Sequence, residues 1–322
     1  MKFQVPDSQK GRLANQPLFR AFNDFLKEYF PYKVQKISLH AGFTCPNRDG
    51  KVGLGGCTYC NNQTFNPAYC QVEKTITQQL EEGIHFFGKK YPEMKYLAYF
   101  QAYTNTYGSL ENLKQRYEEA LSVPGVVGIV IGTRPDSMWP ELYEYLSELR
   151  KRTFVLVEYG LESCYDDVLQ LINRGHCFKD SVEAIQTTAS YGIPVGAHMI
   201  LGLPGRSEEE QIAQAKIISA LPLDTLKLHQ LQLIKGTKMA NQVAENPLYV
   251  QSYSMDEYID FVIAFLRHLR PTLVVERFVS QSPENLLIAP RWGVKNYAFV
   301  DRLKQKMRKQ GVIQGDCYNN IK

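Results

Sequence analysis

The chain of 322 residues lacks any apolar run approaching the roughly 20 residues that a helix needs to cross a bilayer. Its first residues, MKFQVPDSQKGRLANQ, are polar and lack the apolar stretch of a secretory signal peptide. Internal repeats, low-complexity tracts and linker-like segments are also absent. These absences argue against a membrane-spanning or secreted protein. We therefore expect a soluble, cytoplasmic protein with no membrane partner.

A large net charge is lacking as well, since the formal net charge is only +4. The basic residues are nevertheless concentrated at the two ends. Residues 1–40 contain seven Lys and Arg against three acidic residues, and residues 291–322 contain eight against two. Basic ends on a mildly acidic body favour a polyanionic partner, although two solvated helical faces would give the same pattern. One such face is predicted at 300–311, where VDRLKQKMRKQG has the apolar spacing of an amphipathic helix.

An even set of cysteines, which a disulfide framework would need, is missing too, because the chain has seven. In a cytosolic protein cysteines stay reduced and serve as metal ligands or buried thiols. Four of them are scattered and are expected to be free thiols: Cys70, Cys164, Cys177 and Cys317. The other three lie together in HAGFTCPNRDGKVGLGGCTYCNNQTF (40–65).

Short β-rich runs alternate with helical patterns along most of the chain. The predicted strands are 35–42, 95–102, 125–133, 152–160, 193–202 and 224–234. The predicted helices are 72–91, 109–122, 138–151, 178–192 and 207–221, the last with Ser207 as N-cap and Glu210 three residues on. Strands rich in Val, Ile and Leu that alternate with helices indicate parallel βα units.

Six such units are too few for a closed eight-fold barrel. We expect an α/β fold with a partial, TIM-like (β/α)6 barrel at 35–235. A basic N-terminal extension (1–34) and a C-terminal extension with a basic tail (236–322) would flank it, the latter covering the barrel. Because active sites of parallel βα folds lie where the strands end, the polar and glycine-rich strand ends should gather on one face.

The three clustered cysteines follow the first predicted strand with the spacing Cys45-x11-Cys57-x2-Cys60. Thiolates select zinc or iron–sulfur clusters. A structural zinc site takes four ligands, and no fourth is evident, since His40 belongs to the strand and Cys70 is distant. Three cysteines suit a four-iron cluster with one iron left open for a ligand. Structural zinc and unligated thiols remain the alternatives.

Several further motifs appear in a fixed order after this loop: TRPD (133–136), INRGH (172–176), HMILGLPG (198–205) and SPENLLIAPRWGVKN (282–296). Together with HAGFTCPNRDG…GGCTYC they resemble the radical S-adenosylmethionine (SAM) superfamily. The long first gap is similar to the branch of the Elongator catalytic subunit. The whole set looks closer still to a bacterial family often labelled oxygen-independent coproporphyrinogen oxidase-like.

The resemblance implies that Cys45, Cys57 and Cys60 ligate three irons of a [4Fe–4S] cluster and that SAM chelates the fourth. It also implies a set of SAM contacts, comprising Tyr59, Gln101, Tyr103, Thr104, Asn105, Thr133, Glu158, Glu162, Arg174, His198 and Gly202. Arg174 would pair with the SAM carboxylate, and Glu162 replaces a glutamine that is usual there. Simpler readings exist: a helix cap for Glu158, a surface ion pair for Arg174 and a satisfied barrel histidine for His198.

The resemblance further implies reductive cleavage of SAM to a 5′-deoxyadenosyl radical, with flavodoxin or ferredoxin as the one-electron reductant. Similarity to the Elongator subunit implies a tRNA wobble uridine as substrate, although the chain has no room for an acetyltransferase domain. Phosphates would then be held by the basic residues of the C-terminal extension, among them Arg277, Arg291 and Lys295. A small molecule such as a porphyrinogen is the rival substrate. A non-catalytic, zinc-containing nucleic-acid-binding protein is the alternative of another class.

Overall fold

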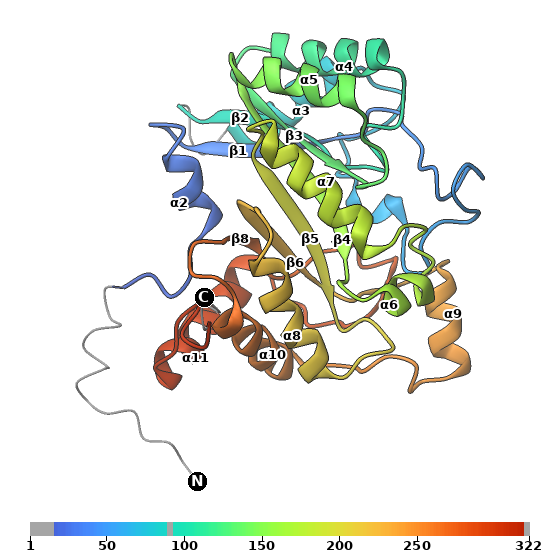
Figure 1. Cartoon of the computed structure of the whole chain (residues 1–322), viewed down its shortest axis with the longest axis vertical. Helices are drawn as coiled ribbons and strands as arrows, with labels where there is room; N and C mark the ends of the chain where they lie inside the picture. Colours follow the sequence, from blue (N-terminus) through green and yellow to red (C-terminus); the bar gives the residue numbers. More distant parts are fainter. Residues whose placement is uncertain (1–15, 89–92, 319–322) are drawn as a thin grey trace.

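The computed structural model describes residues 16–88 and 93–318, and its centre is one sheet of seven parallel strands (Figure 1). The strand order is β1-β2-β3-β4-β5-β6-β8. The bounds are β1 Val34–Leu39, β2 Lys95–Phe100, β3 Val126–Thr133, β4 Phe154–Glu162, β5 Val195–Leu201, β6 Thr225–Gln230 and β8 Val274–Arg277. β1 and β8 form the two edges of the sheet and do not pair. The predicted partial barrel is therefore confirmed as an open one.

The structure differs from the expected six strands in two places. The predicted strand 224–234 is divided into β6 and a short strand β7 (Leu233–Ile234), which pairs antiparallel with β9 (Leu287–Ala289). The sheet also gains β8, which lies parallel to β6 and comes from the C-terminal extension. The sequence did not reveal β8 because its four residues, Val-Val-Glu-Arg, are too short to show a β period.

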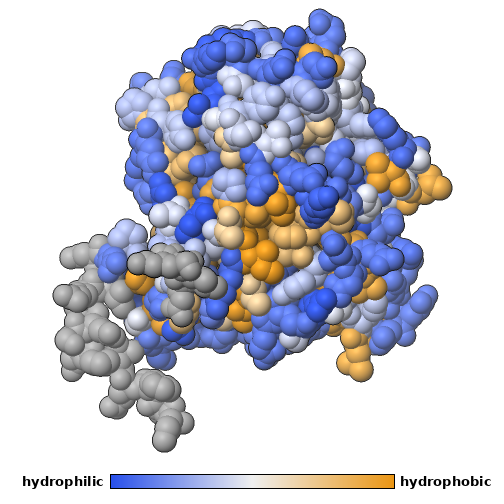
Figure 2. All heavy atoms as spheres, viewed as in Figure 1, coloured by the Kyte–Doolittle hydropathy of each residue, from blue (hydrophilic) through white to orange (hydrophobic). Residues whose placement is uncertain are grey.

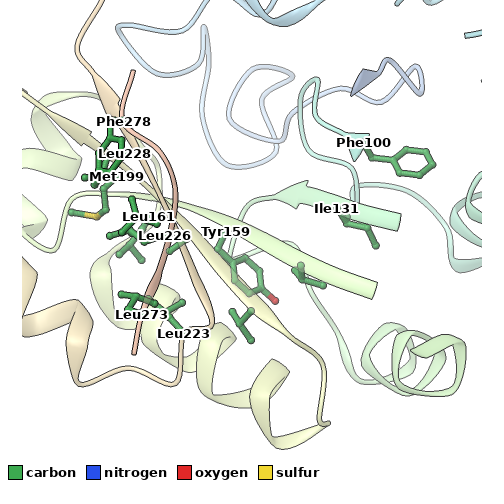
Figure 3. Packing of buried hydrophobic residues seen from close by; sticks show 14 of the residues in the cluster. Phe100, Ile131, Tyr159, Leu161, Met199, Leu223, Leu226, Leu228, Leu273 and Phe278 are labelled. Carbon is green, nitrogen blue, oxygen red and sulfur yellow. The ribbon is translucent and has the colours of Figure 1, made fainter. Parts of the chain in front are cut away.

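Helices cover the convex face of the sheet (Figure 1). They are α3 (Ile76–Gly88), α4 (Leu110–Ser122), α5 (Pro140–Arg150), α7 (Phe178–Ser190) and α8 (Glu208–Ser219), and a short α6 (Asp166–Leu171) precedes α7. The predicted capping box of α8 is present: Ser207 Oγ accepts from the Glu210 amide, and the Glu210 carboxylate accepts from the Ser207 amide. Alternate residues of the strands pack against these helices, as Ile131, Tyr159 and Leu226 illustrate in Figure 3.

The C-terminal extension adds a second layer of helices. α10 (Met255–His268) packs against α8 and against α11 (Asn296–Gln310), while α9 (Lys238–Glu245) follows β7. The predicted helix at 300–311 is thus confirmed, and it buries Phe299, Leu303 and Met307. Hydrophilic residues dominate the outward sides of the helices on the face seen in Figure 2. Within 16–88 and 93–318, no helix is long and apolar enough to cross a membrane.

The concave face of the sheet changes character along the strands. In β4 the residues that face this side are Leu156, then Glu158, then Gly160. The Leu156 level is apolar and is closed by the short helix α2 (Phe22–Lys27), whose Phe22 and Phe25 pack there. The Glu158 level is charged, and the Gly160 level opens into a cavity. α2 belongs to the N-terminal extension; the basic residues of that extension at 2, 10 and 12 lie outside the described residues.

Candidate active site

A cavity lies at the carboxyl ends of the strands, where the sequence predicts the site. Its atom-free volume is about 880 Å³ including its mouth, which is in the range of small-molecule sites, about 300–1,000 Å³. Twelve of the predicted cofactor and metal residues line it: Cys45, Cys57, Tyr59, Cys60, Gln101, Tyr103, Thr104, Thr133, Glu158, Glu162, Arg174 and His198. Residues from five strand ends and the cysteine loop therefore converge on one space.

The cysteine loop is held against the barrel by its backbone. The Thr58 amide donates to Ile172 O (2.9 Å), and Thr58 O accepts from the Met239 amide (2.8 Å). Glycines allow the loop to fold tightly, since Gly56 has a φ of 80° and sits against the Arg48 side chain, where a Cβ would collide. Asn47 is fully buried under the loop and donates to Asn173 O (2.6 Å). These contacts fix the loop before any cofactor binds.

Donors and positive charge surround the thiols. Asn47 Nδ2 and Arg174 Nη1 lie 3.7 and 3.6 Å from Cys57 Sγ, and Asn62 Nδ2 lies 3.6 Å from Cys60 Sγ. Arg48 donates to Cys60 O (2.8 Å). Burial and the nearby Cys57 raise the pKa of Cys60 to about 11, so binding of a metal there must displace a proton. Hydrogen bonds to cysteine sulfur are one of the means by which proteins tune iron–sulfur clusters.

The donor set fits a multinuclear cluster better than a single ion. Among the described residues, no three His, Cys, Asp or Glu side chains converge closely enough to hold one metal ion. A four-iron cluster does not need such convergence, because each thiolate binds a different iron. Three free thiols on one cavity wall, with donors at the sulfurs of Cys57 and Cys60, match that requirement. Structural zinc, which needs a compact tetrahedral set, is disfavoured by the same geometry.

Arg174 occupies the centre of the predicted SAM pocket and is not a surface ion pair, because only 6% of it is exposed. Its Nη2 donates to Gly160 O (2.6 Å) and lies 3.8 Å from Glu162 Oε1, while its buried Nε has no partner. Gly160 is required there, since a Cβ would meet both the Arg174 guanidinium and the Glu162 carboxylate. Arg134 of TRPD supports Arg174 by donating to its carbonyl (2.8 Å). A free guanidinium donor in a buried pocket suits a carboxylate ligand.

The loop 100–106 is tied to the cysteine loop. The Tyr103 amide donates to Asn62 Oδ1 (3.1 Å) and the Thr104 amide to Thr44 O (3.2 Å). Tyr103 adopts a φ of 64°, which aims the loop back toward the cysteines. Gln101 and Thr133 also line the cavity. The loop thus presents polar groups beside the thiols, as the sequence predicts.

Two family models match this chain. One, described as the radical SAM superfamily, matches residues 45–215, and the other, the radical SAM C-terminal domain, matches residues 223–309. The first match alone spans more than half of the chain, from the cysteine loop to α8. The chain belongs to the radical SAM superfamily. It is therefore an enzyme, and its cofactors are a [4Fe–4S] cluster and SAM. A non-catalytic zinc protein, the alternative of another class, is wrong.

Similar proteins agree with this assignment. The chain is 35% identical to the protein YtqA of Bacillus subtilis (strain 168) over 306 residues, which cover 94% of each chain. It is 27% identical over 190 residues to a tRNA uridine(34) acetyltransferase of Methanocaldococcus infernus, covering 58% of this chain and 34% of that protein. The structure of Methanocaldococcus infernus Elp3 lacking residues 1–46 has a TM-score of 0.64 and 18% identity, covering 87% of this chain and 64% of that one. The last likeness shows the shared fold.

Below the cofactor cavity, the radical SAM barrel holds a buried ion network. Glu158, with 1% of its side chain exposed, accepts from Lys36 (2.6 Å), Lys227 (2.8 Å) and His198 Nε2 (2.8 Å). Glu276 of β8 bridges the same two lysines at 2.7 and 3.1 Å. Glu158 therefore lines the cavity but does not cap a helix. Its predicted contact with SAM would have to share a carboxylate whose two oxygens already accept three bonds.

His198 is both satisfied and part of the cavity wall. Burial and the neighbouring Lys227 lower its pKa to about 4, against the hydrogen bond that it donates to Glu158, so the ring is neutral at pH 7. Its Nε2 carries the proton that Glu158 accepts. His229 lies beside it, with ring centroids 5.4 Å apart, and burial and Arg277 hold the pKa of His229 well below its usual range. Two neutral imidazoles thus separate the cofactor cavity from β8.

Acid should destabilise the radical SAM barrel through its buried histidines. Burial lowers the pKa of His176 to about 3 and that of His198 to about 4, and it lowers that of His229 as well. Because these folded pKa values lie below the unfolded value of about 6.5, the unfolded state binds more protons. We expect each histidine to remove about 1.4 kcal/mol of unfolding free energy per pH unit as pH falls from about 6.5 toward 4. The free energy of unfolding is measured by urea denaturation of the wild type and of His198→Gln at several pH values. The slopes of this free energy against pH should differ by about one proton between the two proteins. Equal slopes would contradict the neutral state of His198.

Some predicted residues lie outside the cavity. Asn105 is fully buried and ties the loop after β2 to β3, since its Nδ2 donates to Gly132 O (2.9 Å). Gly202 lines a neighbouring, largely apolar cavity together with Tyr253 and Trp292. Arg291 and Lys295 lie on an exposed groove of the C-terminal extension. Arg277, the third predicted substrate residue, contacts His229 at the edge of the barrel.

Sequence reasoning missed the residues that support the predicted ones. Asn47, Arg48 and Asn62 surround the thiols, and Lys36 and Lys227 balance Glu158. The lysines had a detectable signal, because each stands inside an apolar strand where a charge needs a partner. Asn47, Arg48 and Asn62 gave no such signal, since Asn and Arg are ordinary loop residues.

Proposed function

We propose that this radical SAM enzyme abstracts hydrogen from the C5 side chain of a tRNA wobble uridine. The observation that carries the proposal is the 190-residue similarity to a tRNA uridine(34) acetyltransferase, which covers 58% of this chain but only about a third of that protein. The acetyl-transfer chemistry of that relative is therefore not carried over. A side-chain reaction on the same nucleoside that needs only SAM is the part that fits this barrel.

The cavity residues have different proposed roles. Cys45, Cys57 and Cys60 hold the cluster, and Arg174 orients the SAM carboxylate with its free Nε. Bound together, the cluster and SAM supply homolytic cleavage to methionine and a 5′-deoxyadenosyl radical, with one electron from a flavodoxin or ferredoxin. Tyr59 closes the adenine side, where it packs beside the apolar cluster below the cysteine loop. The buried wall excludes water and oxygen from the reacting centre. The proposal places the reaction in the cytoplasm.

The C-terminal extension is the proposed RNA surface. Arg291 and Lys295 are exposed on one groove, and Arg308 and Lys309 are exposed on α11. Within the described ranges none of these four forms an ion pair, so their charges are free for phosphates. Trp292 does not act as a base platform, because its ring stacks on Phe299 and its Nε1 donates to Tyr253 O (3.1 Å). Tyr297, which is 68% exposed, is the aromatic side chain available there.

Charge reversal in this groove should weaken RNA binding. Lys295→Glu is expected to raise the Kd for tRNA about tenfold at physiological salt and to reduce the salt slope by about one counterion, because one phosphate contact is lost. Lys216→Glu on α8 makes the same charge change at an exposed position far along the chain and should have little effect. Gel-shift titrations at three salt concentrations measure both. Equal affinities for the two variants would remove this groove from the RNA surface.

The function itself is tested by mass spectrometry of tRNA nucleosides. A strain without the gene should accumulate one wobble uridine derivative and lack its product. Reconstituted enzyme with SAM and dithionite should convert the first into the second on tRNA from that strain. The Cys57→Ala enzyme provides the matched control without a cluster. Identical nucleoside profiles in the two strains would refute a tRNA substrate and favour a small molecule such as a porphyrinogen.

A further inference from the structure

A second cavity opens where the barrel is not closed. It is lined by Lys36 and Ser38 of β1 and by Glu276 and Arg277 of β8, the two edge strands of the sheet. Tyr99 and Gln101 line both this opening and the cofactor cavity. The opening therefore leads sideways to the place where the cofactors bind.

Charges in the opening do not balance. Lys36 and Lys227 carry two positive charges, and Glu158 and Glu276 neutralise them through four ion pairs. Arg277 adds a fifth charge. Among residues 16–88 and 93–318, no carboxylate pairs with it. Its Nη2 instead lies 3.2 and 3.3 Å from the two ring nitrogens of His229 and 3.4 Å from Ser280 Oγ.

The guanidinium also has unused donors. Arg277 Nε is buried and has no hydrogen-bond partner. A single Nη2 cannot donate well to both nitrogens of one imidazole. The neighbouring His198 and His229 cannot neutralise the charge, because an imidazole ring is either neutral or positively charged. A partly buried cation without a counterion costs stability, so the fold gains nothing by keeping it there.

We propose that Arg277 binds an oxyanionic group of the substrate, a carboxylate or a phosphate, within the opening between β1 and β8. An oxyanion is the ligand that matches the fork of a guanidinium and supplies the missing charge. The inference rests on the proposed function in one respect, namely that the oxyanion belongs to a tRNA, either as a carboxylate on the uridine side chain or as a backbone phosphate. Binding there positions the substrate beside the cofactor cavity, because Arg277 contacts His229, which lines that cavity.

The site is tested first without RNA. Holoenzyme labelled at histidine with ¹⁵N is titrated with acetate and, separately, with inorganic phosphate, and the ring signals of His229 are followed by NMR. We expect a saturable shift in the wild type that is absent in Arg277→Gln and weaker in Arg277→Lys. No saturable shift with either anion would overturn the inference, whatever the outcome with tRNA. If the His229 signals shift on anion binding but the enzyme leaves all tRNA nucleosides unchanged, the anion site stands and only the tRNA substrate is refuted.

The second test separates a binding role from a structural one. Urea unfolding of Arg277→Gln should show an unchanged or higher midpoint, whereas Lys227→Gln should show a clearly lower one. With tRNA from the deletion strain, kcat/KM of Arg277→Gln should fall at least 100-fold, and Arg277→Lys should recover part of it. A fall in midpoint as large as that of Lys227→Gln, with turnover retained, would overturn the inference.

The accumulated nucleoside identifies the source of the oxyanion. If it is a carboxylate of the side chain, the isolated nucleoside is retained on an anion-exchange column at pH 7 and Arg277→Gln leaves tRNA affinity in gel shifts unchanged. If it is a backbone phosphate, the nucleoside is neutral and Arg277→Gln lowers both the affinity and its salt slope. A neutral nucleoside together with unchanged affinity and slope would contradict both forms.

Discussion

Cys57→Ala should reduce SAM cleavage to the level of a protein-free control. Cys57 is one of three thiols on the cavity wall, and two donors, Asn47 Nδ2 and Arg174 Nη1, converge on its sulfur. Two thiolates do not hold a four-iron cluster in the geometry that leaves one iron open. Anaerobic reconstitution, electron paramagnetic resonance with and without SAM, and assay of 5′-deoxyadenosine measure the loss.

The matched control for this variant is Cys317→Ala, which removes a thiol near the end of the described chain. Cys317 contributes a backbone bond to Arg267 O (2.8 Å), which the substitution keeps. Cleavage should persist in this control. The Cys57 variant should still fold, because loss of one small buried side chain costs about 1 kcal/mol. If Cys57→Ala made 5′-deoxyadenosine at the wild-type rate, the cluster assignment would be wrong.

Lys227→Met should be among the most destabilising single substitutions in the barrel. Burial alone would raise the pKa of Glu158, but Lys227 and Lys36 outweigh it and hold that pKa well below its usual range. Removing Lys227 leaves Glu158 with one lysine and takes away a donor to Tyr99 Oη (2.9 Å). Breaking a buried pair from one side costs about 3–5 kcal/mol, which chemical denaturation can measure.

A double variant separates charge from packing in this network. Lys227→Met combined with Glu158→Gln removes one charge of each sign, and the remaining Lys36 and Glu276 still pair at 2.7 Å. The double variant should therefore unfold at a higher urea concentration than Lys227→Met alone. A double variant less stable than the single one would mean that the bonds of the Glu158 carboxylate to Lys36 and His198 outweigh the cost of its unbalanced charge.

Much of the cofactor site was readable from the sequence because it follows strand ends. Cys45 lies in the loop after β1, Thr133 ends β3 and Glu162 ends β4, so the parallel order of the strands brings them to one edge. The other predicted SAM contacts followed from the motifs that resemble the radical SAM superfamily. Asn105 and Gly202 were predicted on the same basis but lie beside the cavity. The Asn105 side chain is turned toward Gly132 O, and Gly202, just past the end of β5, lines the neighbouring cavity.

The sequence by itself determined the superfamily, the parallel βα order and the three-cysteine loop, because local patterns and ordered motifs can be recognised without knowledge of tertiary contacts. Only the tertiary structure decided that β8 joins the sheet, since four residues carry no period and the pairing with β6 spans about 50 positions. The same holds for the charge network: Lys36, Glu158, Lys227 and Glu276 come from four strands, and their partners are set by which strands the open barrel brings face to face. The unpaired charge of Arg277 is visible only once those four are matched.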